Sequence, residues 1–126
     1  NICTNSGLCA LAFTIHMTLL GEAGLTKLAR INHANAVQLA ELLEKVNGVE
    51  LLNESFFNEF TIRVAGDGAR VVERLAERGI LGGVPVSRLA PNAGLDDLII
   101  LASTEVNTDE DRRALAQALS DIGGDA

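Results

Sequence analysis

The sequence is poor in large aromatic side chains and in basic ones. It has no tryptophan, no tyrosine and four phenylalanines in 126 residues, so its core must be built mostly from Leu, Ile, Val and Ala. Ten Lys and Arg residues face 17 Asp and Glu residues, and the net charge of −7 argues against a nucleic acid or an anionic membrane as partner. The hydrophobic fraction of 48% indicates a folded chain, and the length fits one domain.

Cysteine is also scarce, with Cys3 and Cys9 as the two members. Residues six apart on a helix lie about 9 Å apart along its axis and on different faces, so we expect no disulfide within the chain. The spacing is not that of a CxxC metal or redox pair. These observations favour a reducing compartment, and we expect a cytoplasmic bacterial protein. The apolar stretch 8–20 is too short to span a membrane.

The first predicted helix, over residues 6–20, is apolar on nearly every side. Its apolar residues are Leu8, Leu11, Phe13, Ile15, Leu19 and Leu20. A helix of this kind needs partners on all sides, and the chain begins without methionine. We therefore expect a piece cut from a larger protein, and we expect the isolated piece to self-associate through this helix.

The remaining pattern predicts helices that alternate with short strands. A second helix is expected over 25–46 and is followed by strands over 49–52 and 60–64. The apolar stripe of the second helix includes Leu25, Leu28 and Ala29. A helix over 69–78 buries Val72, Leu75 and Ala76 and ends at Gly79, a short edge strand surrounds Pro85, and a central strand covers 98–101. A last helix starts at Asn107 or Thr108, ends at Gly123 and buries Leu115, Ala118, Leu119 and Ile122. This order predicts an α/β protein, more closely an α+β two-layer sandwich with helices on one face of an antiparallel or mixed sheet.

No residue in this pattern forms a self-sufficient catalytic site. Lys27 and Lys45 fall on the wet face of the second helix, whereas a Schiff-base lysine needs a desolvated pocket. His16 and His33 are not at metal-ligand spacing, and we expect His16 to be a buried histidine with a hydrogen-bond partner. Neither cysteine has a histidine base in view. We therefore predict no catalytic residue and no metal site in this chain.

Two further features have a structural and a functional interpretation. The carboxylates at 109–111 could bind a metal, but their place at a helix start favours compensation of the helix dipole. Gly82 and Gly83 could cradle a phosphate, but no Walker lysine follows, and a tight turn is the better interpretation.

Six segments, in order along the chain, carry a resemblance to one family. They are NICTNSGLCAL (1–11), LGEAGL (20–25), ARINH (29–33), FFNEF (56–60), GILGG (79–83), and TE (104–105) followed by DED (109–111). Together they resemble the glycine cleavage system P-protein, the decarboxylating glycine dehydrogenase. The segments FFNEF (56–60) and GILGG (79–83) most resemble subunit 1 of the two-subunit bacterial type.

The resemblance implies a piece of a pyridoxal-phosphate enzyme of the aspartate-aminotransferase fold type. Residues 1–47 would be a helical arm from the end of the large domain, and residues 48–126 the small C-terminal domain. It also implies glycine as substrate, with subunit 2 and lipoylated H-protein as partners. The cofactor lysine of the family belongs to subunit 2, so the fragment alone should be inactive and without cofactor.

Thr4 and Asn5 lie in the best-matched segment and could line the cofactor pocket, although helix capping is the simpler role for them. The alternative for the whole chain is a stand-alone ferredoxin-like ligand-binding or regulatory module, which the part after Val49 could support alone. The first helix separates the two hypotheses, because a free-standing module would not carry so large an apolar surface.

Overall fold

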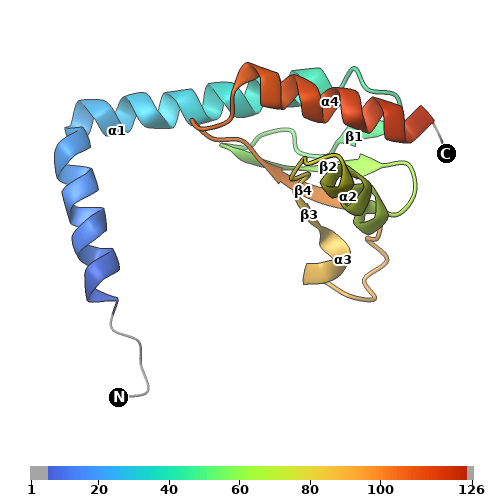
Figure 1. Cartoon of the computed structure of the whole chain (residues 1–126), viewed down its shortest axis with the longest axis horizontal. Coiled ribbons are helices and arrows are strands. Elements are labelled where there is room, and N and C mark those ends of the chain that lie inside the picture. Colours follow the sequence, from blue (N-terminus) through green and yellow to red (C-terminus); the bar gives the residue numbers. More distant parts are fainter. Residues whose placement is uncertain (1–5, 125–126) are drawn as a thin grey trace, which may run out of the picture.

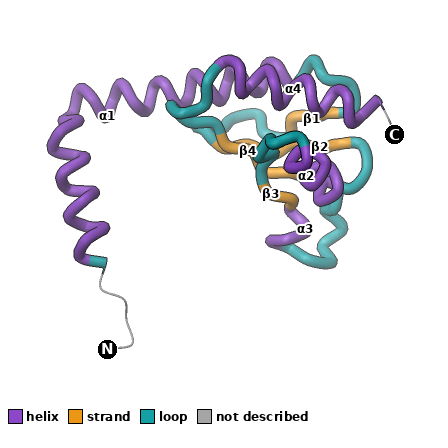
Figure 2. The backbone as a smooth tube through the Cα atoms, viewed as in Figure 1, coloured by secondary structure: helices purple, strands orange, loops and turns teal. Residues whose placement is uncertain are grey.

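The structure is a computed structural model that describes residues 6–124. Its elements are α1 (Gly7–Leu43), β1 (Val49–Leu51), β2 (Glu59–Val64), α2 (Gly68–Glu77), β3 (Val84–Pro85), α3 (Val86–Leu89), β4 (Leu98–Ala102) and α4 (Asp109–Gly124). The strands form one antiparallel sheet in the order β1-β2-β4-β3. The second part of α1 lies beside α4, and both run along the same side of the sheet (Figures 1 and 2). The predicted α+β sandwich is confirmed.

The two predicted N-terminal helices form one long helix with a sharp bend. The break lies at Gly21, whose backbone angles are φ 60° and ψ −174°, and a residue with a side chain would be strained there. Gly24 does not interrupt the helix, and α1 ends at Leu43, earlier than predicted. The first part of α1, which precedes the bend, projects away from the rest of the molecule (Figure 1).

By length and composition alone, α1 could cross a membrane, a test that core helices of soluble proteins also pass. The bend at Gly21 leaves residues 7–20 a straight length of only about 21 Å at 1.5 Å per residue, less than the ~30 Å of a bilayer core. That the chain does not enter a membrane stays a prediction.

The core lies between the sheet and the three helices α1, α2 and α4. Alternation along β2 directs Phe60, Ile62 and Val64 toward the helices, and β4 adds Ile99 and Leu101. The last helix contributes all four residues that the sequence predicts as buried, namely Leu115, Ala118, Leu119 and Ile122. From α1, the buried residues are Ala36, Leu39, Ala40 and Leu43. The end of α1 therefore belongs to the same core as the sheet, and a domain division near residue 47 stays a prediction.

Some of the predicted burial is wrong. In α2, Val71 is buried with Leu75, whereas Val72 is only partly buried and Ala76 is exposed, because the helix is rotated by about one residue from the predicted face. In α1, Leu25 is exposed and Leu28 and Ala29 are only partly buried, since the sheet and α4 reach only the later turns.

Local sequence signals explain most of the helix ends. The side chain of Asp67 accepts hydrogen bonds from the amides of Ala69 and Arg70 and caps α2. Gly79 follows α2 with φ 76°, as predicted for the residue after a helix. At the other helix, Thr108 and Asp111 exchange backbone and side-chain hydrogen bonds in a capping box before α4. That helix runs to Gly124 and passes the predicted stop at Gly123.

Candidate functional site

A groove of about 680 Å³ lies at the C-terminal end of β4. We call it the β4 groove. Its lining includes Leu39, Leu81, Val84, Ile100, Ser103 and Asp111. Five elements (α1, β2, β3, β4 and α4) and the loops after α2 and β4 contribute to it. Such a volume is within the range of ligand pockets in proteins.

A buried arginine lies against this groove. Arg112 is 5% exposed, although it sits in the first turn of α4. Its guanidinium donates to the backbone oxygen of Asn107 at 2.6 Å and to the side-chain oxygen of Gln38 at 2.9 Å, and it forms an ion pair with Asp109. The positive charge is therefore satisfied within the chain, and the arginine links α4 to α1.

The loop between β4 and α4 is held from both sides. The side-chain amide of Asn35, on α1, donates to the backbone oxygen of Thr104 at 2.8 Å. Within the loop, Asn107 accepts from the amide of Thr104 at 2.8 Å. These bonds and those of Arg112 fix the loop, while Val106 in its middle is 74% exposed.

The acidic segment 109–111 works as a helix start. Hydrogen bonds from the side chain and the backbone amide of Thr108 hold the pKa of Asp111 below its ordinary value. Among residues 6–124, no group of three or more His, Cys, Asp and Glu side chains could hold a metal ion. The dipole interpretation of this segment is the one that the geometry supports.

The backbone at Gly82 and Gly83 packs closely against α2 and β4. A Cβ on Gly82 would lie 2.2 Å from a side-chain carbon of Leu75, and one on Gly83 would lie 2.3 Å from the backbone oxygen of Ile100. Gly83 also has φ 87°. Close packing of this loop against α2 and β4 therefore explains both glycines.

The lysines and histidines lie apart from the groove. Both lysines are exposed, as predicted, with Lys27 on α1 and Lys45 in the turn that follows α1. The prediction for His16 is wrong, because it lies on the projecting part of α1 and is exposed. His33 stacks on the ring of Phe57 at 5.9 Å between centroids, and its Nδ1 lies 2.8 Å from the backbone oxygen of that residue.

Cys9 is exposed and free. Thr4, Asn5 and Cys3 lie outside the described residues, so the pocket-lining role of Thr4 and Asn5 stays a prediction. Within residues 6–124, the geometry offers the β4 groove and a structural arginine.

Neither the buried Arg112 nor Ser103 was predicted from the sequence. A signal for Arg112 was present, because it lies three residues before Leu115 and seven before Leu119, on the buried face of α4. Ser103 directly follows the apolar run of β4, and it is 1% exposed with a hydroxyl oxygen that has no hydrogen-bond partner. No feature of the sequence marks it.

The architecture places the chain in the class of aminotransferase-like pyridoxal-phosphate folds. Among solved structures, it is similar to an archaeal O-phosphoseryl-tRNA(Sec) selenium transferase, with a TM-score of 0.65 over 82% of the chain at 20% identity. It is also similar to an aminotransferase from Streptoalloteichus hindustanus, with a TM-score of 0.61 over 81% of the chain at 15% identity. At these identities the likeness concerns the fold alone.

A much stronger similarity is to a crystal structure of glycine decarboxylase (P-protein) of the glycine cleavage system. The TM-score is 0.85 at 36% identity, over 97% of this chain and 27% of that one. The model of the glycine cleavage system P-protein family matches residues 1–119. The chain therefore belongs to the glycine cleavage system P-protein family, as the sequence segments suggested.

Curated relatives are described as "Probable glycine dehydrogenase (decarboxylating) subunit 1". The protein from Azorhizobium caulinodans is 68% identical over 122 residues, and the one from Methylocella silvestris is 66% identical over the same length. Each alignment covers 97% of this chain but only 27% of the relative. The chain thus spans about a quarter of the length of these relatives, and the stand-alone module receives no support from the comparisons.

Proposed function

We propose that this chain works as part of glycine dehydrogenase (decarboxylating) subunit 1. The observation that carries the proposal is the match of the P-protein family model to residues 1–119, together with 68% identity to a subunit 1 protein. The intact enzyme would decarboxylate glycine and transfer the aminomethyl group to the lipoyl arm of H-protein, in a cytoplasmic complex with subunit 2.

The described residues do not fit a resident pyridoxal phosphate. Such a site needs a lysine in a desolvated pocket and donors for a phosphate. Lys27 lies in an open depression along α1 with Glu22 and Arg30, and Lys45 lies beside Glu41 and Arg113 on the outer surface. Both lysines are exposed. We therefore place the cofactor on a lysine of subunit 2, and the role of this chain is to complete the fold of subunit 1.

Reduction with borohydride tests the position of the cofactor. We expect sparse labelling of both Lys27 and Lys45 when the chain is incubated with pyridoxal phosphate and reduced, because exposed lysines react without selectivity. Peptide mapping by mass spectrometry would give the result. A stoichiometric adduct at one lysine would contradict the proposal.

Exchange of labelled CO2 into the carboxyl group of glycine tests the function. The full-length subunit 1 that carries these residues should support exchange when mixed with subunit 2, H-protein and pyridoxal phosphate. We expect none from the 126-residue chain in place of subunit 1, and none from either subunit alone. Exchange catalysed by the chain with pyridoxal phosphate, in the absence of subunit 2, would overturn the proposal.

A further inference from the structure

The edge of β4 is only partly covered. Hydrogen bonds from Ser103 to Asn58 and from Val64 to Asp97 show which pairs of β2 and β4 are hydrogen-bonded. Because such pairs alternate in an antiparallel ladder, the N–H and C=O of Ala102 point away from β2. On that side, β3 begins at Val84 opposite Ile100, and no backbone hydrogen bond joins Ala102 to Gly82, the residue that would face it if the register continued. One residue of the edge is therefore unpaired and faces the β4 groove.

The groove continues beneath this edge, between the sheet and the helices. Leu39, Leu101 and Leu115 form an apolar wall on this side. The buried Ser103 lies on the same face of β4 as Leu101 and also lines the groove, and its hydroxyl oxygen has no partner. A buried hydroxyl without a partner is costly, so the groove offers both apolar contact and an unsatisfied polar group.

The rim of the groove is apolar, and the groove as a whole carries negative charge. Leu81 is 95% exposed and Val84 is 41% exposed. The carboxylates of Glu59 and Asp111 line the groove, whereas the charge of Arg112 is already paired with Asp109. An occupant with apolar side chains and at least one Lys or Arg would match this surface.

We propose that the β4 groove holds an extended segment from the part of subunit 1 that lies outside this chain, an inference that rests on the proposed membership in subunit 1. The segment pairs with the backbone of Ala102, sends alternate side chains toward Ser103 and Leu115, and covers Leu81. A segment of the same polypeptide is the favoured occupant because the aligned part makes up only 27% of the relatives, and because a tethered segment binds at a high effective concentration.

Hydrogen–deuterium exchange on the chain alone and on full-length subunit 1 tests this proposal. We expect the amide of Ala102 to exchange about tenfold or more slowly in the full-length subunit, because it gains a hydrogen bond there. Leu81→Asp should remove this protection. Leu89→Asp is the matched control, since Leu89 is 65% exposed but does not line the groove, and it should leave the protection unchanged.

Equal exchange of Ala102 in the two proteins would overturn the proposal, as would equal behaviour of the two variants. Protection that arises only after addition of subunit 2 would assign the occupant to the partner subunit and would also overturn it. The measurement needs neither glycine nor cofactor, so its failure is distinguishable from a failure of the CO2 exchange assay. Protection without CO2 exchange would leave the docking intact and contradict only the catalytic assignment.

Discussion

The two parts of α1 contain the same kinds of apolar residue in opposite surroundings. Before the bend at Gly21, Leu8 is 79% exposed and Leu19 is 81% exposed, whereas Leu39 and Leu43 at the other end are 3% and 0% exposed. The later part lies on the sheet beside α4, and the earlier part has no such neighbour among the described residues (Figure 1). The comparison shows that an apolar pattern in a helix predicts that the helix packs against something. The pattern does not show whether the packing partner is in the same chain.

A matched pair of truncations in this one helix should separate its two parts. Leu43→Ala should lower the free energy of unfolding by about 2–5 kcal/mol, because it opens a cavity in the core. At a concentration low enough to keep the chain monomeric, Leu19→Ala should change it by less than about 0.5 kcal/mol, because the side chain is exposed in the single chain. Urea denaturation followed by circular dichroism suits a chain without tryptophan. Similar urea midpoints of unfolding for the two variants would contradict the proposed difference between the two parts of α1.

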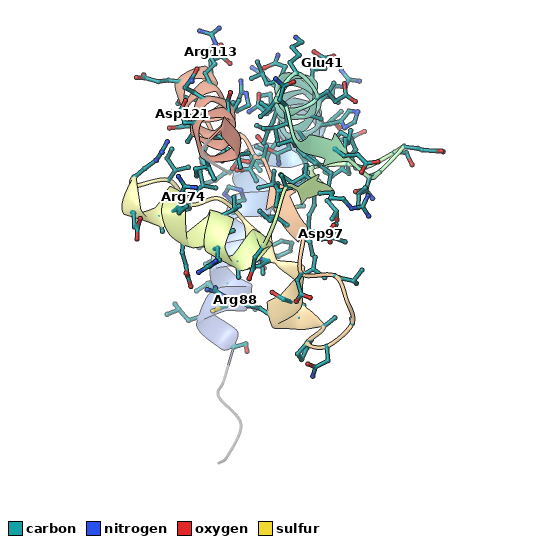
Figure 3. The ribbon with its side chains drawn as sticks, turned by 90° about the vertical axis from the view of Figure 1, so that its right-hand side faces the viewer. Glu41, Arg74, Arg88, Asp97, Arg113 and Asp121 are labelled. Carbon is teal, nitrogen blue, oxygen red and sulfur yellow. The ribbon has the colours of Figure 1, made fainter. Side chains whose placement is uncertain are left out.

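Two adjacent arginines on α4 give a second contrast. Arg112 is buried and bonded to α1 and the loop before α4, whereas Arg113 and Glu41 point away from the sheet (Figure 3). Arg112→Met should destabilise the chain by about 1–3 kcal/mol, because the acceptors on Asn107 and Gln38 lose their donor. Arg113→Met should be nearly neutral in the same denaturation experiment. An equal effect of the two changes would show that Arg112 does not hold the helices together.

The residue after α2 tests backbone conformation alone. A Cβ on Gly79 would meet nothing within 4 Å, so the positive φ of 76° is the only obstacle to a side chain. Gly79→Val should cost about 1 kcal/mol or more, while Gly79→Asn should cost less, because Asn tolerates this conformation. Thermal unfolding of the two variants measures the difference. A Val variant as stable as the Asn variant would mean that φ is not positive there.

The smallest effect concerns the start of α4. The lowered pKa of Asp111 means that its ionised form stabilises the folded chain, that this contribution is complete above the unfolded pKa of about 4, and that it is lost as the pH falls through the lower folded value. Asp111→Asn should therefore be less stable than the wild type at neutral pH, with a gap that narrows below about pH 4. A gap that is constant with pH would exclude this role of the carboxylate.

Local signals made much of the fold predictable from the sequence. Alternation in β2, the apolar run of β4 and Gly79 each depend on a few neighbouring residues, and the structure has them as expected. The exposure of His16 and the burial of Arg112 depend on which elements surround a helix, and that is not local information. The β4 groove could not be predicted either, because it arises where the pairing of β3 with β4 stops at Ile100, two residues before Ala102.

The central claim is that the first part of α1 requires a partner that the chain itself does not supply. Light scattering over a concentration series tests it directly. The wild-type chain should shift from the mass of one chain toward that of two, and Phe13→Glu with Leu20→Glu should move the equilibrium toward the monomer. Leu52→Glu with Leu89→Glu adds the same charge at exposed apolar sites outside α1 and should leave the association unchanged. A wild-type chain that stays monomeric at high concentration would contradict the claim.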